Sequence, residues 1–182
     1  LLELRRVLLH NVAIAKAHGR RRASRSSQHL LRRGSSQYMS REIISLGDPE
    51  TGATARFLPS LGCNCFQFLV PTPAGPVDVL WSEPGFEHGD KRPSGSGIPL
   101  LFPFPGRIRG TTLRWDNRDY VLEAGDGRGN AIHGFALDRP WRVLELTESL
   151  LVAEFQASVD DSLLLDRWPA DFRITATYSV HG

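Results

Sequence analysis

GIPLLFPFPGRIRG (residues 97–110) is the stretch around which the chain is organised, and NAIHGF (130–135) and RPW (139–141) follow it. Its prolines and glycines fix an irregular backbone, because proline lacks an amide proton and has a fixed φ. Its large apolar side chains can anchor that backbone. Three polar residues, Arg107, Asn130 and His133, are left for binding. Loops held by a rigid scaffold often carry binding chemistry, so we expect a binding site here.

The segments on either side of this stretch have the period of β-strands. Apolar and polar residues alternate over 151–157 and 172–179, which is typical of strands with one buried face. In 63–70, alternation places Cys63, Cys65 and Gln67 on one face and Phe66, Phe68 and Val70 on the other. No long segment after Met39 has a helical period. Further strands are expected at 42–46, 54–58, 77–82, 111–115, 120–123 and 141–146. We predict an all-β fold, an antiparallel β-sandwich.

The first 38 residues differ from the rest in charge. They contain nine Lys/Arg and one acidic residue, a net charge of +8, whereas residues 39–182 have a net charge of −6. The sole methionine, Met39, resembles a start site, so we favour the interpretation of 1–38 as upstream sequence read in frame, or a remnant of cloning. A targeting peptide or a basic arm for an anionic partner are the alternatives. We expect this leader to lie outside the fold, partly helical over 1–17 and otherwise disordered.

The composition of the 182 residues limits the partners. One domain with a sizeable core is expected at this length, and no apolar run is long enough to span a membrane. The net negative charge of residues 39–182 does not indicate nucleic acid as a partner. Cys63 and Cys65 are separated by one residue, so a disulfide between them would be strained. We expect reduced thiols, a cytoplasmic location, and neither a metal nor a cofactor.

The four pieces GIPLLFPFPGRIRG, LRWDNRDYVL (113–122), NAIHGF and RPW, in this order and spacing, resemble the aldose 1-epimerase (galactose mutarotase) family. The resemblance covers residues 39–182 and implies a galactose mutarotase-like β-supersandwich. It also implies an isomerase of carbohydrate metabolism that interconverts the α and β anomers of hexoses. Domains of this family are about twice as long, so we expect this chain to be the N-terminal part of one.

The resemblance also implies roles for individual residues. His133 matches the family's first active-site histidine, which binds the sugar near its ring oxygen. Arg107 matches the arginine that binds sugar hydroxyls, although Gly106 replaces the asparagine that commonly precedes it. Asn130 is a weaker candidate, because asparagine before a tight loop often serves the turn.

The principal acid and base of the family, a histidine and a glutamate, match no position in this chain. We therefore expect the chain alone to be inactive, with His133 as an assisting residue. The alternatives are a non-catalytic carbohydrate-binding β-sandwich and a fragment whose sheet edges need a second chain. The residue types here do not separate hexoses from hexose phosphates, since Arg107 and Arg109 suit either.

Overall fold

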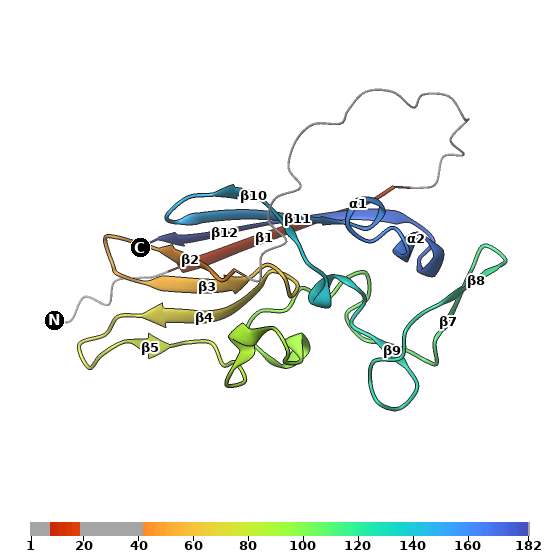
Figure 1. Ribbon diagram of the computed structural model, residues 1–182, viewed down its shortest axis with the longest axis horizontal. Coiled ribbons are helices and arrows are strands. Elements are labelled where there is room, and N and C mark those ends of the chain that lie inside the picture. Colours follow the sequence, from red (N-terminus) through yellow and green to blue (C-terminus); the bar gives the residue numbers. More distant parts are fainter. Residues whose placement is uncertain (1–7, 19–41, 182) are drawn as a thin grey trace, which may run out of the picture.

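The computed structural model describes residues 42–181 and, as backbone, residues 8–18; Figure 1 shows two sheets in face-to-face layers. One sheet has the order β1-β12-β11-β10, and the other has the order β2-β3-β4-β5. The first contains β1 (Leu8–His18), β12 (Asp171–His181), β11 (Leu150–Gln156) and β10 (Arg142–Leu146). The second contains β2 (Ile44–Gly47), β3 (Thr54–Leu58), β4 (Asn64–Val70) and β5 (Val77–Asp78). All neighbouring strands pair antiparallel, so the predicted sandwich is confirmed.

The core lies between the two sheets and follows the predicted alternation in β11 and β12. Buried and half-buried residues alternate along β11 and almost throughout β12. The rings of Phe57 in β3 and Tyr178 in β12 meet with centroids 4.7 Å apart and join the two layers. The Tyr178 hydroxyl donates a hydrogen bond to the Cys63 carbonyl at 3.3 Å. Burying each large apolar side chain contributes roughly 1.5–3 kcal/mol, so packing between the two sheets stabilises the sandwich.

The alternation predicted for residues 63–70 is wrong, because β4 contains a β-bulge. Arg56 pairs with Gln67 but the next residue, Phe57, pairs with Cys65, so Phe66 is skipped. An extra residue in one strand reverses the faces of the residues beyond it. Cys65 and Phe68 therefore share the main core, whereas Phe66 packs in a small separate cluster.

The strand expected at 77–82 is shorter than predicted. β5 ends at Asp78, where a side-chain oxygen takes the place of a backbone acceptor: Asp78 Oδ1 accepts hydrogen bonds from the amides of Phe68 and Leu80, both at 3.1 Å. The side chains of Val77, Val79 and Trp81 are exposed. The sequence pattern alone does not show that a side chain competes with the ladder.

The prediction of a helix within residues 1–17 is wrong for the part that the structure describes. Residues 8–18 form β1, which pairs with β12 along its whole length, from Leu8 opposite His181 to His18 opposite Asp171. An unpaired strand edge presents a row of free amide and carbonyl groups, and pairing with that edge outweighs a weak local helix propensity. The rest of residues 1–41 lies outside the described residues, and the domain boundary after residue 38 remains a prediction.

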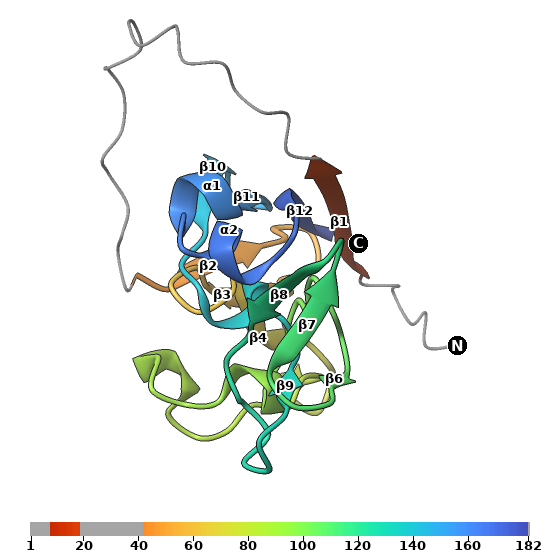
Figure 2. The ribbon, with the colours of Figure 1, turned by 90° about the vertical axis from the view of Figure 1, so that its right-hand side faces the viewer.

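The remaining elements are short and lie at one end of the sandwich (Figure 2). β6 (Arg107–Ile108) pairs with β9 (Ala131–Ile132), and β7 (Thr112–Trp115) pairs with β8 (Arg118–Val121). The strands expected at 111–115 and 120–123 leave four residues between them, but the loop between β7 and β8 has only two, Asp116 and Asn117, both with positive φ, as in type I′ hairpins. Single-turn helices complete the chain: η1 (Phe86–His88), η2 (Pro93–Gly95), η3 (Ala136–Asp138), α1 (Ala157–Asp160) and α2 (Leu164–Arg167). Within the described residues, none of these helices has the length and apolar character needed to cross a membrane.

Candidate functional site

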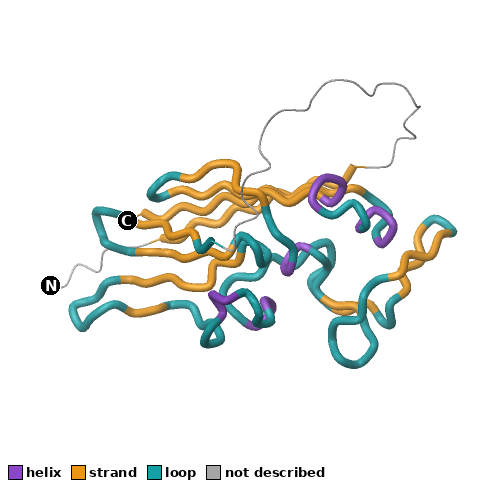
Figure 3. Tube along the Cα trace, viewed as in Figure 1, coloured by secondary structure: helices purple, strands orange, loops and turns teal. Residues whose placement is uncertain are grey.

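Residues 97–141 run mostly as loop beside the sandwich, as the teal tube in Figure 3 shows. The loop is attached to β4 through Asn64, whose side chain is buried. Asn64 Oδ1 accepts a hydrogen bond from the Ile98 amide at 3.1 Å, and its Nδ2 donates to the carbonyls of Ser96 and Pro93 at 2.9 and 3.3 Å. A buried amide with all these partners holds irregular backbone in one position.

The His133–Gly134 corner is packed directly on the strand-like segment at Phe102. The Phe102 carbonyl accepts hydrogen bonds from the amides of Phe135 and Ala136, at 2.7 and 3.2 Å. Gly134 has φ of 70°, and a Cβ added to it would lie 2.6 Å from Pro103 N and closer still to the Phe102 carbonyl. Only glycine fits this contact, so the glycine fixes where the preceding histidine stands.

His133 itself has a positive φ of 68°, which is uncommon for a residue with a side chain. Its amide donates to the Gly106 carbonyl at 3.2 Å, and its ring Nδ1 lies 2.7 Å from the Pro105 carbonyl. Since a carbonyl oxygen can only accept, Nδ1 carries a proton and donates. In the neutral imidazole Nε2 then has the free lone pair, so the ring orientation and the tautomer are both set by the loop. Backbone strain of this kind is found at functional sites.

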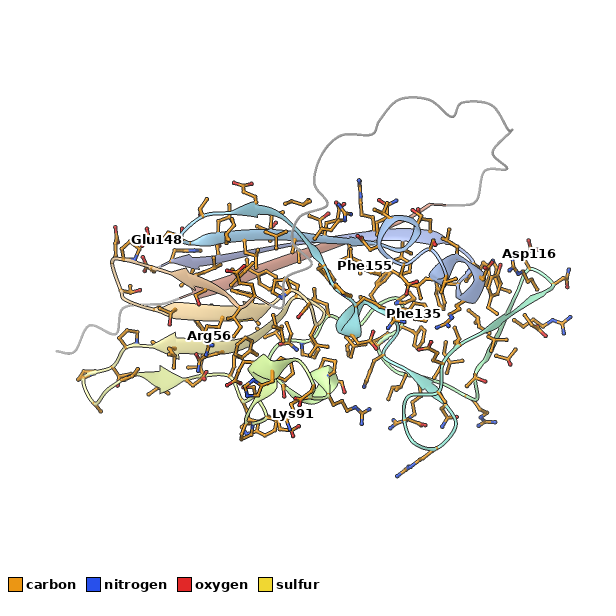
Figure 4. All side chains as sticks on the ribbon, viewed as in Figure 1. Arg56, Lys91, Asp116, Phe135, Glu148 and Phe155 are labelled. Carbon is orange, nitrogen blue, oxygen red and sulfur yellow. The ribbon has the colours of Figure 1, made fainter. Side chains whose placement is uncertain are left out.

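A cavity of about 370 Å³ lies beside His133. Phe104 and Phe135 form apolar wall, and their rings meet edge to face at 5.9 Å between centroids. Phe135 also stacks on Phe172 of β12 at 6.5 Å, so the cavity wall continues into the core; Figure 4 shows Phe135 between the sandwich and the loops. The volume is within the roughly 300–1,000 Å³ of small-molecule sites.

The charged groups of the cavity wall are largely paired with one another. The Arg139 guanidinium donates to Asp138 at 2.6 Å and to Asp161 at 3.0 Å, and Glu123 lies 3.9 Å from it. Burial raises the pKa of Asp138, and the neighbouring Arg139 opposes that shift. Within residues 42–181, Arg92 is a lining cation with no ion pair.

Arg107 and Asn130 meet at a common partner, Asp126. Asp126 Oδ2 accepts hydrogen bonds from Arg107 Nε at 3.0 Å and from Asn130 Nδ2 at 2.8 Å. Its Oδ1 accepts from the amides of Arg128 and Asn130, at 2.8 and 3.0 Å. These hydrogen bonds, of which those from Asn130 have the largest effect, hold the pKa of Asp126 well below its usual range, because they stabilise the charged form. Asn130 Oδ1 accepts from the Gly110 amide at 2.9 Å.

The three predicted site residues are therefore close in the fold but not equivalent. Arg107 lies opposite Ile132 in the β6–β9 pair, one residue before His133. His133 lines the cavity, whereas Arg107 and Asn130 do not. The Asn130 side-chain amide is bonded to Asp126 in its own loop and to the Gly110 amide after β6, so its role in sugar binding remains a prediction. A second cavity, of about 500 Å³ between β2 and β10, includes none of the three.

Asp126 is the residue that sequence reasoning missed. The run from Gly125 to Gly129 has alternating glycines and suggests a flexible linker. The sequence did contain one signal of a structured turn, an aspartate followed by glycine. In Asx turns the Asp side chain accepts a hydrogen bond from the amide two residues later.

Solved structures resemble this sandwich. An aldose epimerase homologue from C. elegans shares 24% identity at a TM-score of 0.57, over 77% of this chain and 42% of its own. A protein from Synechocystis shares 23% identity at a TM-score of 0.58, over 76% of this chain and 44% of its own. A galactose mutarotase-like protein from Clostridium acetobutylicum shares 21% identity at a TM-score of 0.56, over 70% of this chain and 39% of its own. This chain thus spans less than half the length of these proteins, and at these identities the likeness concerns the fold.

No curated protein matches the chain. The sequence profile of the aldose 1-epimerase family matches residues 42–182. This range includes the His133 corner, the Asp126 loop and every strand of the two sheets except β1. The chain belongs to the aldose 1-epimerase family.

Proposed function

We propose that this chain binds a hexose at His133 and Arg107, as the sugar-binding part of an aldose 1-epimerase that interconverts α and β anomers. The observation that carries the proposal is the fixed imidazole of His133. Its Nδ1 is held by the Pro105 carbonyl, so Nε2 is the ring atom available to a ligand in the adjoining cavity.

The chemistry of mutarotation defines what such a site must supply. A base removes the proton of the anomeric hydroxyl and an acid protonates the ring oxygen, so that the ring opens. The carbonyl group then turns and the ring closes on its other face. Each group must lie within hydrogen-bonding distance of its atom.

In this proposal His133 binds the sugar near its ring oxygen through Nε2. Arg107 binds hydroxyl groups through its two Nη groups, which have no partner within residues 42–181. The rings of Phe104 and Phe135 suit the CH faces of a pyranose. The principal acid and base are not supplied by these residues, so the chain alone binds the sugar without accelerating mutarotation.

A hexose titration tests the binding. Isotope-labelled chain is titrated with D-galactose and with D-glucose, and the amide resonances of the 130–135 corner are followed by NMR. We expect saturable shifts for the wild type that are lost in His133→Ala. His88→Ala is the matched control, because His88 lies exposed on the 3₁₀ turn η1 and does not line the cavity. Equal shifts in the wild type and in His133→Ala would place the sugar elsewhere.

A further inference from the structure

Asp126 is a nearly enclosed carboxylate in an otherwise exposed loop. Its side chain is 1% exposed, while its neighbours Gly125 and Gly127 are exposed. Its two oxygens accept four hydrogen bonds, from Arg128, twice from Asn130, and from Arg107. An enclosed charge requires this degree of pairing, and the low pKa that results keeps it ionised across the pH range of ordinary assays.

The contact with Arg107 has an informative geometry. Asp126 engages the guanidinium through Nε alone, at 3.0 Å. The two Nη groups, which form the distal fork, remain unpaired within residues 42–181, and the Arg107 side chain is 59% exposed. The enclosed carboxylate thus holds the base of the guanidinium while its fork stays open to a ligand. A planar fork recognises two adjacent oxygen atoms better than a single point charge does.

The same carboxylate fixes the backbone around the site. Asn130, which Asp126 holds at its amide and side chain, accepts from Gly110, and the Gly110 carbonyl accepts from the Ala131 amide at 2.8 Å. Asp126 therefore joins the end of β6 to the start of β9, the strands on which Arg107 and His133 depend.

We infer that Asp126 is a positioning residue for the hexose site: it pre-orders the Arg107 guanidinium so that its Nη fork binds a pair of neighbouring sugar hydroxyls. This inference rests on the proposed function. Without Asp126, Arg107 would have to be immobilised when the sugar binds. Immobilising one long side chain weakens affinity by roughly three- to tenfold.

The test measures the contact and its consequence separately. In the sugar-free chain, the solvent exchange of the Arg107 Nε proton is measured by ¹⁵N NMR; we expect slow exchange in the wild type and faster exchange in Asp126→Asn. The dissociation constant for D-galactose is then expected to rise roughly three- to tenfold in Asp126→Asn. Asp119→Asn is the matched control, because Asp119 forms an exposed ion pair with Arg114 at 3.9 Å; it should change neither quantity.

A double-mutant cycle separates positioning from a general loss of structure. If Asp126 acts through Arg107, Asp126→Asn added to Arg107→Gln should weaken galactose binding no further than Arg107→Gln alone. If Asp126→Asn does not fold, Asp126→Ser takes its place, because serine can still accept from the loop amides but is too short to reach Arg107.

Two results would overturn the inference. Galactose affinity unchanged in Asp126→Asn, with faster Arg107 exchange, would reduce Asp126 to a loop-holding role while the hexose site stands. A wild-type chain that binds no hexose, although its Arg107 proton exchanges slowly, would remove the proposed function and the inference with it.

Discussion

Gly134→Ala tests whether the backbone contact beneath His133 is as tight as the structure places it. Gly134 has φ of 70°, and its missing Cβ would fall against the Phe102–Pro103 backbone, 2.6 Å from Pro103 N. Heavy atoms this close must move apart. The neighbouring atoms belong to backbone that also accepts two hydrogen bonds, so they cannot rotate away.

The expected magnitude has two parts. A left-handed conformation costs an L-residue roughly 1–2 kcal/mol. Forcing a methyl group into filled space costs about 1–3 kcal/mol more. The free energy of unfolding should therefore fall by roughly 2–5 kcal/mol, a large share of the 5–15 kcal/mol typical of a domain.

Urea unfolding followed by tryptophan fluorescence measures this change, with Gly127→Ala as the control. Gly127 has the same φ of 70°, but nothing lies within 4 Å of its Cβ position, so it should lose only the conformational part, about 1–2 kcal/mol. The difference between the two variants isolates the steric part. Equal losses would refute the close approach of Gly134 to Phe102.

Three further predictions concern buried or half-buried groups. Cys63 and Cys65 are buried and reduced, and burial raises the pKa of Cys65 to about 12 and that of Cys63 further. A thiol reagent at pH 8 should therefore label neither thiol until urea unfolds the chain, and labelling of the native chain would contradict this burial. Trp141→Phe should lower the free energy of unfolding by about 2–4 kcal/mol, measured in urea, because the buried indole donates a 2.9 Å hydrogen bond to a backbone carbonyl. Burial acts to raise the pKa of Asp171, but hydrogen bonds from Ser158 and other donors outweigh it, and the net pKa is lowered. The stability that ionised Asp171 contributes to the fold is therefore present above the ordinary pKa of 3.8 and is lost as the pH falls below it. The difference in unfolding free energy between wild type and Asp171→Asn should shrink in acid, and a difference independent of pH would exclude this linkage.

The sequence predicted the parts of the fold that depend on a simple period. The alternation in β11 and β12 follows from one buried and one half-buried face, and it appears in the structure as expected. The predicted segment at 54–58 coincides with β3. Resemblance to a family drew attention to His133, but the positive φ of His133 and the close contact of Gly134 with Phe102 are seen only in the folded chain. The role of His133 in sugar binding stays a prediction.

Other features depend on contacts that no local pattern records. The bulge at Phe66 depends on register with β3, and β5 ends where the Asp78 carboxylate takes the place of a backbone partner. β1 forms because β12 offers it an open edge. Asp126 lies between glycines, and only the folded chain shows that Arg107 and Asn130 converge on it.

Polarimetry tests the central claim most directly, that this chain carries the sugar-binding residues of an aldose 1-epimerase without the proton-transfer pair. The mutarotation of freshly dissolved α-D-glucose and α-D-galactose is followed with the wild type and with His133→Ala, at chain concentrations where NMR shows the sugar bound. We predict the rate of buffer alone for both proteins. Acceleration by the wild type that disappears in His133→Ala would contradict the account, because it would show that the chain assembles a working acid and base by itself.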